Sequence, residues 1–262
     1  FTNEKGYQLV DRFKQTISQA KFFDALVGYF RISGFHQLYK ELEGVDKIRI
    51  LVGLDVDKKS FDLIDETRQQ GLDFESNKKA TQITTQAVIE ELNTSEDSYN
   101  TEVSGLKFKE FLTTDCNNKE DDISNGGNGK KLEFRVYPSK NIHAKVYVTR
   151  YKDHISSIQK GSVITGSSNF SFTGLQANRE FNVELKNDSD VNFALNQFED
   201  LWKNSVDISK DYITTLDKKT WLNENISPYD LYLKMLYEYF KEDINIDIQM
   251  ELDLPEGFMD LE

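Results

Sequence analysis

Two apolar runs of strand length, separated by a helical segment, constrain the fold of this chain more than any other feature. Residues 22–30 (FFDALVGYF) and 47–52 (KIRILV) are nearly unbroken apolar runs, and runs of this length predict buried strands. Residues 7–20 place apolar side chains on one helical face, and residues 32–42 again show a helical pattern. This alternation indicates an α/β fold, with a mixed or parallel sheet flanked by helices.

The same pattern continues towards the C-terminus with two interruptions. A polar, helical pattern at about 56–113 predicts a helical insertion, and a stretch rich in Asn, Gly and Asp at about 115–131 predicts a mobile loop. Four further strands and one helix are then predicted, at 131–137, 142–148, 162–166 and 181–185 for the strands and 191–202 for the helix.

The composition changes near residue 205, which divides the chain into two predicted parts. Residues 1–205 form the main domain, and residues 206–262 form a small appendage of short helices with an acidic end. We expect Trp202, Trp221 and the aromatic residues of Tyr229–Tyr239 to pack in a core rather than to line a groove for a partner. The chain begins at Phe1 without a methionine, and we expect it to be a piece of a longer polypeptide.

Charge and cysteine content limit the functions that this chain can have. The net charge of −13 disfavours broad, nonspecific binding to nucleic acid or to anionic lipid, although a local basic cluster can override it. The single cysteine, Cys116, cannot form an internal disulfide, which favours a reducing, cytoplasmic compartment. No apolar run approaches the roughly 18 residues of a membrane span, so we expect no membrane partner.

Polar residues with catalytic potential gather between residues 141 and 180, at predicted strand ends. His143 and Lys145 are two residues apart on a predicted strand, so their side chains should project from one face. A turn after the next strand carries hydroxyl and amide groups at Ser167, Ser168 and Asn169. Together with Glu180, these groups offer an imidazole, a fixed cation, neutral donors and an orienting carboxylate.

Each of these residues has an ordinary structural explanation when it is taken alone. A histidine on a strand is usually structural, a lone lysine usually reaches solvent, and Ser or Asn residues are common in turns. The acidic run Glu120–Asp122 is explained best as a solvated loop, and no cluster has metal-ligand spacing. We therefore expect no metal and no cofactor. No single residue of this set indicates a site, but the combination of these residues does.

The stretches NIHAKVYV and GSSNFSFTGLQANREFNVEL carry a family resemblance over about residues 130–203. They resemble the His-x-Lys and Gly-Ser-x-Asn signature of the phospholipase D superfamily. More narrowly, the chain is similar to the phospholipase D-like domain that precedes the motor of some bacterial superfamily-two helicases. The segment Leu254–Phe258 resembles the lead-in to such a motor.

This resemblance implies a role for each matching residue. His143 would be the nucleophile of one half-site and form a phosphohistidine, and Glu180 would fix the tautomer of a histidine. Neutral and cationic donors would hold the nonbridging oxygens of the substrate phosphate, namely Lys145, Ser167, Ser168 and Asn169. The implied catalytic residues are thus His143, Lys145, Asn169 and Glu180.

Two departures and one omission qualify the resemblance. The family pattern has Asp five residues after its lysine, where this chain has Arg150, so a supporting carboxylate is lost. The interval from Lys145 to Gly166 is also long, which predicts a loop around residues 151–161. The chemistry needs two half-sites and this chain has one, so the resemblance implies a homodimer with the site across its two-fold axis.

Two functions remain open at this point. The first is a hydrolase, a metal-independent phosphodiesterase that cuts nucleic acid (DNA by preference) within a larger helicase or restriction-type protein. The second is a catalytically degenerate module that binds DNA or dimerises a helicase. Intact His143, Lys145, Asn169 and Glu180 favour the enzyme, and Arg150 favours the module. A lipid phosphodiesterase is a weaker third class.

Overall fold

The computed structural model describes residues 1–53, 77–86 other than 79, 99–116, 128–138 and 142–219, and some residues between 228 and 240. Most of the predicted insertion and mobile loop, Trp221 and the segment Leu254–Phe258 lie outside the described residues. One compact unit spans Phe1–Leu222 and a second spans Asn223–Glu262.

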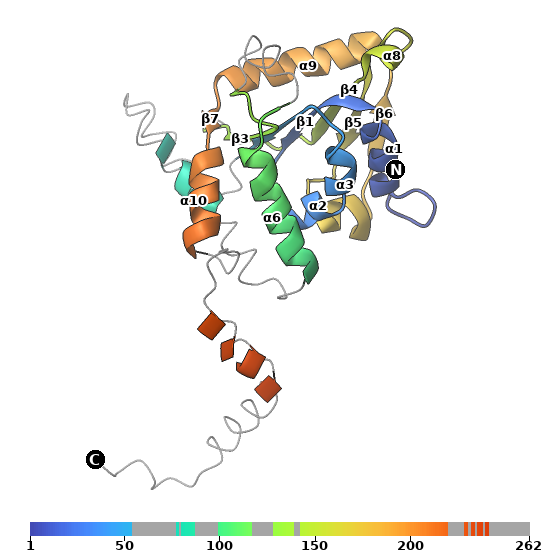
Figure 1. The fold of residues 1–262 in the computed structure, drawn as a ribbon. Helices are drawn as coiled ribbons and strands as arrows, with labels where there is room; N and C mark the ends of the chain where they lie inside the picture. The colour runs from blue at the N-terminus through green and yellow to red at the C-terminus, as the bar shows by residue number, and fades with distance from the viewer. Residues whose placement is uncertain are drawn as a thin grey trace, which may run out of the picture. The chain divides into compact units, whose positions relative to one another are not determined.

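A seven-stranded mixed sheet forms the centre of the first unit (Figure 1). Its strand order is β6-β5-β4-β1-β2-β3-β7. The pairs β1/β2 and β2/β3 are parallel, and the remaining neighbours are antiparallel. The strands are β1 (Ala20–Val27), β2 (Lys47–Val52), β3 (Leu132–Val136), β4 (Val146–Tyr151), β5 (Gly161–Gly166), β6 (Asn182–Leu185) and β7 (Val206–Asp207).

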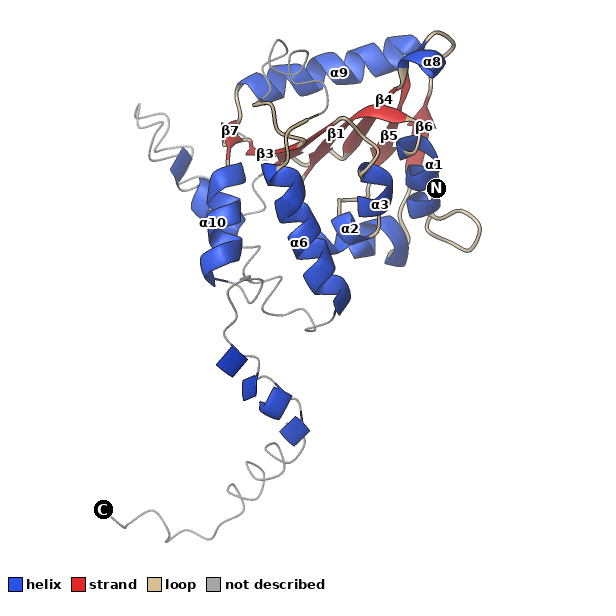
Figure 2. Ribbon diagram, in the orientation of Figure 1, coloured by secondary structure: helices blue, strands red, loops and turns tan. Residues whose placement is uncertain are grey.

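Helices cover both faces of this sheet, which confirms the predicted α/β architecture (Figure 2). The long helix α9 crosses one face, and α1, α2, α3, α6 and α10 lie on the other. The predicted helix at 32–42 is two short helices. The helical elements are α1 (Leu9–Ile17), α2 (Ile32–His36), α3 (Tyr39–Leu42), α6 (Tyr99–Thr113), α8 (Asp153–Ser156), the π-helix η1 (Thr173–Ala177), α9 (Asp188–Lys203) and α10 (Ser209–Lys219).

Aromatic rings fill the core between the sheet and the α1 side. Phe30 stacks on Phe170 with centroids 5.4 Å apart and lies 5.0 Å from Phe108 of α6. Phe134 of β3 meets Tyr212 of α10 edge to face at 4.9 Å. Such pairs add to the hydrophobic stabilisation that buried rings already provide. Because β7 and α10 follow residue 205 and pack here, the main core extends beyond that position.

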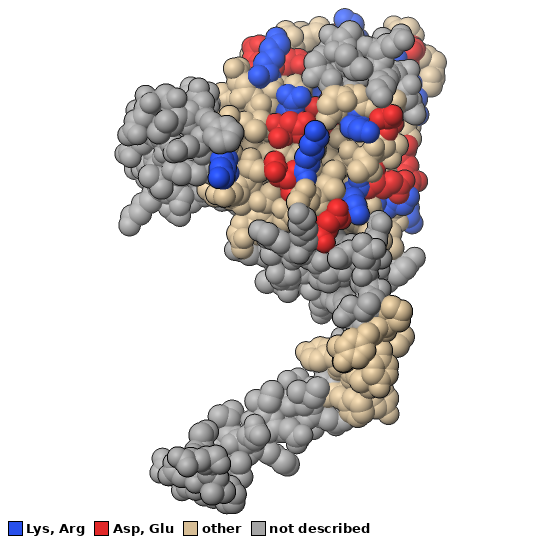
Figure 3. Space-filling view, turned by 60° about the vertical axis from the view of Figure 1, so that its left-hand side comes forward, with Lys and Arg blue, Asp and Glu red and all other residues tan. Residues whose placement is uncertain are grey.

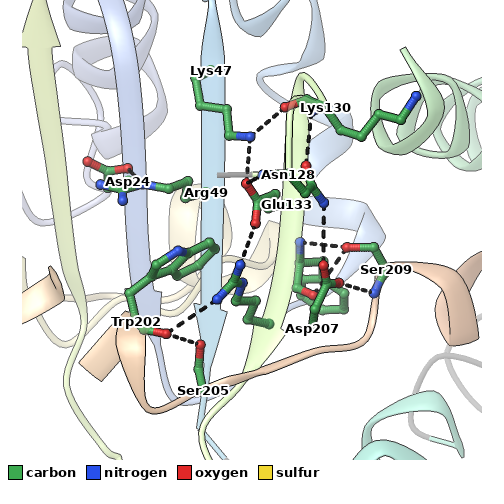
Figure 4. A network of polar contacts seen from close by, with 12 residues as sticks. Asp24, Lys47, Arg49, Asn128, Lys130, Glu133, Trp202, Ser205, Asp207 and Ser209 are labelled. Carbon is green, nitrogen blue, oxygen red and sulfur yellow. Dashed lines mark hydrogen bonds and ion pairs between the residues drawn. The ribbon is translucent and has the colours of Figure 1, made fainter. Parts of the chain in front are cut away.

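Charged side chains line the α9 face of the sheet instead (Figure 4). Glu133 is fully buried and accepts hydrogen bonds from Lys47 at 2.6 Å and from Arg135 at 2.9 Å. The Arg135 guanidinium lies 4.4 Å from the ring centroid of Trp202, which is 2% exposed. The prediction that Trp202 packs in a core is thus confirmed.

The second unit does not bury its aromatic residues among the described part of the chain. The described residues between 228 and 240 are helical, and four tyrosines there are between 55% and 79% exposed, namely Tyr229, Tyr232, Tyr237 and Tyr239. The prediction that these tyrosines pack in a core is therefore wrong for the described residues of this unit.

Candidate functional site

His143 and Lys145 lie on the irregular segment before β4, so the prediction that they sit on a strand is wrong. The structure nevertheless brings them together. The Lys145 Nζ atom lies 3.0 Å from His143 Nδ1 and 3.2 Å from Nε2, and it donates a hydrogen bond to the His143 carbonyl at 2.8 Å. Lys145 is 5% exposed, whereas His143 is exposed. A buried cation thus supports an imidazole that faces solvent.

Asn169 is held by the backbone that follows β1. Its side-chain Oδ1 accepts hydrogen bonds from the amides of Gly28 at 3.1 Å and of Tyr29 at 3.2 Å. These contacts assign the oxygen to the backbone, so the Nδ2 group is the donor that remains for a ligand. A Cβ atom on Gly28 would lie 3.2 Å from Asn169 Oδ1 and 3.7 Å from Lys145 Nζ. Gly28 therefore marks the point where the amide and the ammonium converge.

The loop that carries Asn169 is fixed from below by the aromatic core. Phe170 is fully buried, and its carbonyl accepts a hydrogen bond from Arg31 N at 2.9 Å. The Tyr147 hydroxyl donates to the Ser168 carbonyl at 2.8 Å. Burial raises the pKa of Tyr147 well above its usual value, so this hydroxyl stays protonated. A Cβ atom on Gly34 would meet the Phe170 carbonyl carbon at 2.6 Å, so α2 packs directly on this loop.

The two serines of the loop occupy different environments. Ser168 is fully buried, and its hydroxyl accepts a hydrogen bond from Asn182 Nδ2 at 2.9 Å. The structure therefore does not bring the Ser168 hydroxyl to the surface of the site. Ser167 is exposed, and its Oγ accepts a hydrogen bond from Phe181 N at 3.0 Å. The hydroxyl proton of Ser167 remains available to a ligand.

Glu180 lies close to this loop but not on the imidazole. Its charge contributes to the raised pKa of Tyr147, after burial and the neighbouring Tyr29, so the carboxylate is near the buried phenol. Among the hydrogen bonds of the described residues, none joins Glu180 to His143. The structure thus assembles His143, Lys145 and Asn169, while the predicted carboxylate–imidazole contact is not formed within one chain.

Arg150 has a buried partner that the sequence comparison did not reveal. Asp24, at the centre of β1, accepts hydrogen bonds from Arg150 Nη2 at 3.1 Å and from Arg49 Nε at 2.6 Å. Burial opposes ionisation of Asp24, but the two guanidinium groups outweigh it and hold its pKa below the usual value. Arg150, which stands where the family pattern has Asp, is thus paired with a buried carboxylate on the neighbouring strand.

The residues that sequence analysis missed each carried a signal. Asp24 is the one charge inside the apolar run FFDALVGYF, and a buried charge requires a partner. Gly28 and Tyr29 stand near the end of the same apolar run, and a glycine after a buried strand indicates close approach of another group. Asn182 follows Glu180 closely, and it orders the loop through Ser168.

Neither a metal-ligand set nor a membrane span was found in the described part of the chain. No three His, Cys, Asp or Glu side chains come together there in an arrangement that could hold a metal ion. None of the helices in the same ranges is long and apolar enough to cross a bilayer.

Comparison with known proteins locates the similarity on this site. Residues 116–202 match the family model described as cardiolipin synthase, PLD-like domain. No curated protein matches the sequence. Similar solved structures include NucT from Helicobacter pylori, which is 11% identical over 76% of this chain and 90% of that chain, with a TM-score of 0.39.

Two further solved structures are similar to the chain. Nuc, a phospholipase D family member from Salmonella typhimurium, is 15% identical over 75% of this chain and 88% of that chain, with a TM-score of 0.37. Phosphatidylserine synthase from Haemophilus influenzae is 13% identical over 89% of this chain and 43% of that chain, with a TM-score of 0.42. The segment that carries His143, Lys145 and Asn169 thus lies within the residues that match the PLD-like family model.

Proposed function

We propose that this chain is a metal-independent phosphodiesterase that cuts nucleic acid through a phosphohistidine intermediate. The observation that carries the proposal is the convergence of Lys145 Nζ on the His143 ring beside the fixed amide of Asn169. A phosphodiester needs a nucleophile and donors for its nonbridging oxygens, and preorganised donors of this kind stabilise developing charge effectively. Lys145, Asn169 and Ser167 are the donors that we assign to the phosphate.

The proposed reaction has two steps. In the first, a ring nitrogen of His143 attacks phosphorus, the bond to the leaving oxygen breaks, and a second imidazole donates a proton to that oxygen. In the second, water attacks the phosphohistidine, gives its proton to the second imidazole, and releases His143. Lys145 and Asn169 hold the nonbridging oxygens in both steps.

A second copy of the chain would provide the second imidazole. His36 is only partly exposed and its ring contacts Ser104, so it is not placed for this role. The exposed ring of His143 can face the same ring of a partner across a two-fold axis. In that dimer we assign Glu180 to orient a histidine, since it forms no hydrogen bond to His143 within the described part of one chain.

The first experiment is cleavage of labelled single- and double-stranded DNA in excess EDTA. We expect cleavage by the wild type, none by His143→Ala, and full activity in His154→Ala, which removes an exposed histidine of α8. Equal cleavage by the wild type and His143→Ala would refute the histidine mechanism. DNA binding without cleavage by any of the three proteins would support the degenerate module instead.

Dimer and substrate class are tested separately. Sedimentation should show a dimer, and activity per chain should fall on dilution below its dissociation constant. Vesicles of phosphatidylglycerol provide the lipid alternative, and their hydrolysis with DNA left intact would replace nucleic acid as the substrate class. We also propose that a helicase motor belongs to the full-length protein, which DNA-dependent ATP hydrolysis by that protein would test.

A further inference from the structure

An exposed phenylalanine lies directly beside one of the proposed phosphate ligands. Phe181 is 68% exposed. Its amide donates to Ser167 Oγ at 3.0 Å, and its carbonyl accepts from Ser167 N at 3.1 Å. These two hydrogen bonds fix the backbone of Phe181 against Ser167, while the ring stays in solvent. The ring therefore offers an apolar surface to a ligand beside Ser167.

A second aromatic residue is attached in the same way to the other side of the site. The Tyr29 amide donates to Asn169 Oδ1 at 3.2 Å. The Arg31 guanidinium lies 5.2 Å from the centroid of the Tyr29 ring, a distance typical of a cation–π pair. Arg31 is in turn anchored by its amide to the carbonyl of Phe170. A half-buried ring with a guanidinium on its face is thus held next to the phosphate-binding amide.

A third exposed aromatic ring lies on the loop that carries Asn169. Phe172 comes three residues after Asn169 and is 42% exposed. Its amide is 3.5 Å from Ser33 Oγ, at the start of α2. Phe172, Phe181 and Tyr29 therefore sit on the three backbone segments that carry or contact Asn169 and Ser167.

Charge alone does not give this chain a strong hold on a phosphate backbone. The net charge is −13. On the face drawn in Figure 3, basic side chains of the described residues alternate with acidic ones and form no continuous stripe. Lys145, the cation of the site, is buried. Because attraction between a protein and nucleic acid normally depends on such charges, another source of affinity is needed.

We propose that Tyr29, Phe172 and Phe181 stack on unpaired bases beside the scissile phosphate, so that the substrate of this site is a single strand. This inference rests on the proposed function, because it takes the bound phosphate to belong to nucleic acid. Aromatic rings bind single strands through the faces of the bases. In a duplex, neighbouring base pairs cover the faces of the bases, so the same rings would add no affinity for a duplex.

Two consequences separate this inference from binding by charge. Affinity should depend on the bases more than on the phosphates, so a strand with abasic tetrahydrofuran units should bind poorly at equal charge. The dependence of affinity on salt should also be shallow, because few counterions are released. Removal of one stacking ring should weaken binding of a normal strand about 5- to 100-fold.

The experiment measures fluorescence anisotropy of labelled oligothymidylate, an abasic strand of equal length and a duplex, all in EDTA. His143→Ala is the parent protein, so that no probe is cut, and Phe181→Ala is added to it. We expect oligothymidylate to bind at least about tenfold more tightly than the other probes, and Phe181→Ala to weaken that probe alone. Phe193→Ala, which removes a ring that is 67% exposed on α9, is the matched control and should change nothing.

Three outcomes would overturn the inference. Equal binding of oligothymidylate and the abasic strand would exclude stacking, and so would an unchanged affinity in Phe181→Ala. Loss of a dimer in Phe181→Ala, seen by sedimentation together with equally weakened binding of all probes, would assign the ring to a subunit interface. If the wild type nevertheless cleaved both the oligothymidylate and the abasic strand, the proposed function would stand without the stacking site. Base-dependent binding without cleavage would instead keep the stacking site and refute the enzyme.

Discussion

The sheet face towards α1, α2 and α6 is packed with aromatic rings, whereas the face towards α9 holds buried ions. On the aromatic face, Phe170 and Tyr147 hold the loop that positions Asn169. On the ionic face, Asp24 of β1 forms an ion pair with Arg150 of β4. Both faces stabilise the fold, and the loop of Asn169 is held by residues of the aromatic face. The difference suggests that activity and stability can be separated by the face that is mutated.

Arg150 shows what this difference means for the resemblance. Arg150 on β4 forms an ion pair with the buried carboxylate of Asp24 on β1, whereas the family pattern has an aspartate at the position of Arg150. Since neither Asp24 nor Arg150 forms a hydrogen bond to Asn169 or His143 among the described residues, a rearranged pair there is compatible with an intact site. A change on the aromatic face, which positions the loop, would not be compatible with one.

Phe170→Ala should have the largest effect. Phe170 is fully buried, and removal of its ring should lower the free energy of unfolding by about 3–5 kcal/mol. Because the same residue anchors the loop, activity per folded molecule should also fall. Phe198→Ala removes an equally buried ring on the α9 side, and it should destabilise without that loss of activity. Urea denaturation and cleavage rates measure both effects, and equal specific activities would refute the comparison.

Asn169→Asp should separate catalysis from folding on the aromatic face. An aspartate keeps an acceptor for the amides of Gly28 and Tyr29, so stability should change little. It removes the Nδ2 donor and places a negative charge against the phosphate, so the cleavage rate should fall by about 10²–10³-fold. Circular dichroism and single-turnover rates measure the two quantities. A clear loss of stability together with an unchanged cleavage rate per folded molecule would show that Asn169 is purely structural.

Asp24→Asn should destabilise the ionic face without affecting the site. The substitution removes the buried carboxylate that Arg49 and Arg150 share and leaves Arg49 with Glu199 alone, and we expect a loss of about 3 kcal/mol in unfolding free energy. Asp153→Asn is the matched control, since the Asp153 carboxylate is 85% exposed beside Lys21 and should contribute less than about 1 kcal/mol. Activity per folded molecule should be unchanged in both variants. A specific loss of activity in Asp24→Asn would connect the ionic face to the site.

A double-mutant cycle should measure the coupling between Asp24 and Arg150. We compare Asp24→Ala, Arg150→Ala and the double variant by urea denaturation, and expect a coupling of about 1–2 kcal/mol. The value is smaller than the loss in the preceding variant because Arg49 also binds Asp24. Additive effects would mean that Asp24 and Arg150 do not stabilise each other, although they lie within hydrogen-bond distance.

The strands that carry the aromatic face could be predicted from sequence, because buried strands appear as runs of apolar residues. The runs 22–30 and 47–52 predicted two central strands, and His143, Lys145 and Asn169 were recognised from their spacing. Strand limits were less predictable. The strand containing Val146 begins after Lys145 instead of at residue 142, and in the preceding irregular segment Lys145 Nζ contacts the ring and the carbonyl of His143.

The ionic face could not be predicted, because a pairing between strands depends on register. Asp24 and Arg150 are far apart in sequence, and they meet because Phe22 lies opposite Arg150 and Asp24 opposite Val148. The burial of Ser168 has the same origin, since it depends on Asn182 across the β5/β6 pair. Sequence spacing names the residues of a site, whereas the sheet register decides which of their groups face outwards.

The pH dependence of stability is the smallest expected effect and tests the ionic face most directly. The pKa of Asp24 is lowered in the folded state, so its stabilising contribution is fully present above the unfolded value of about 3.9. The contribution is lost as the pH falls through the lower, folded value. The stability difference between wild type and Asp24→Asn should therefore be constant from neutral pH down to about 5, and narrow only below about 4. Urea midpoints across this range measure it. A stability difference that widens as the pH falls towards about 5 would mean that burial outweighs the two arginines and raises the pKa of Asp24.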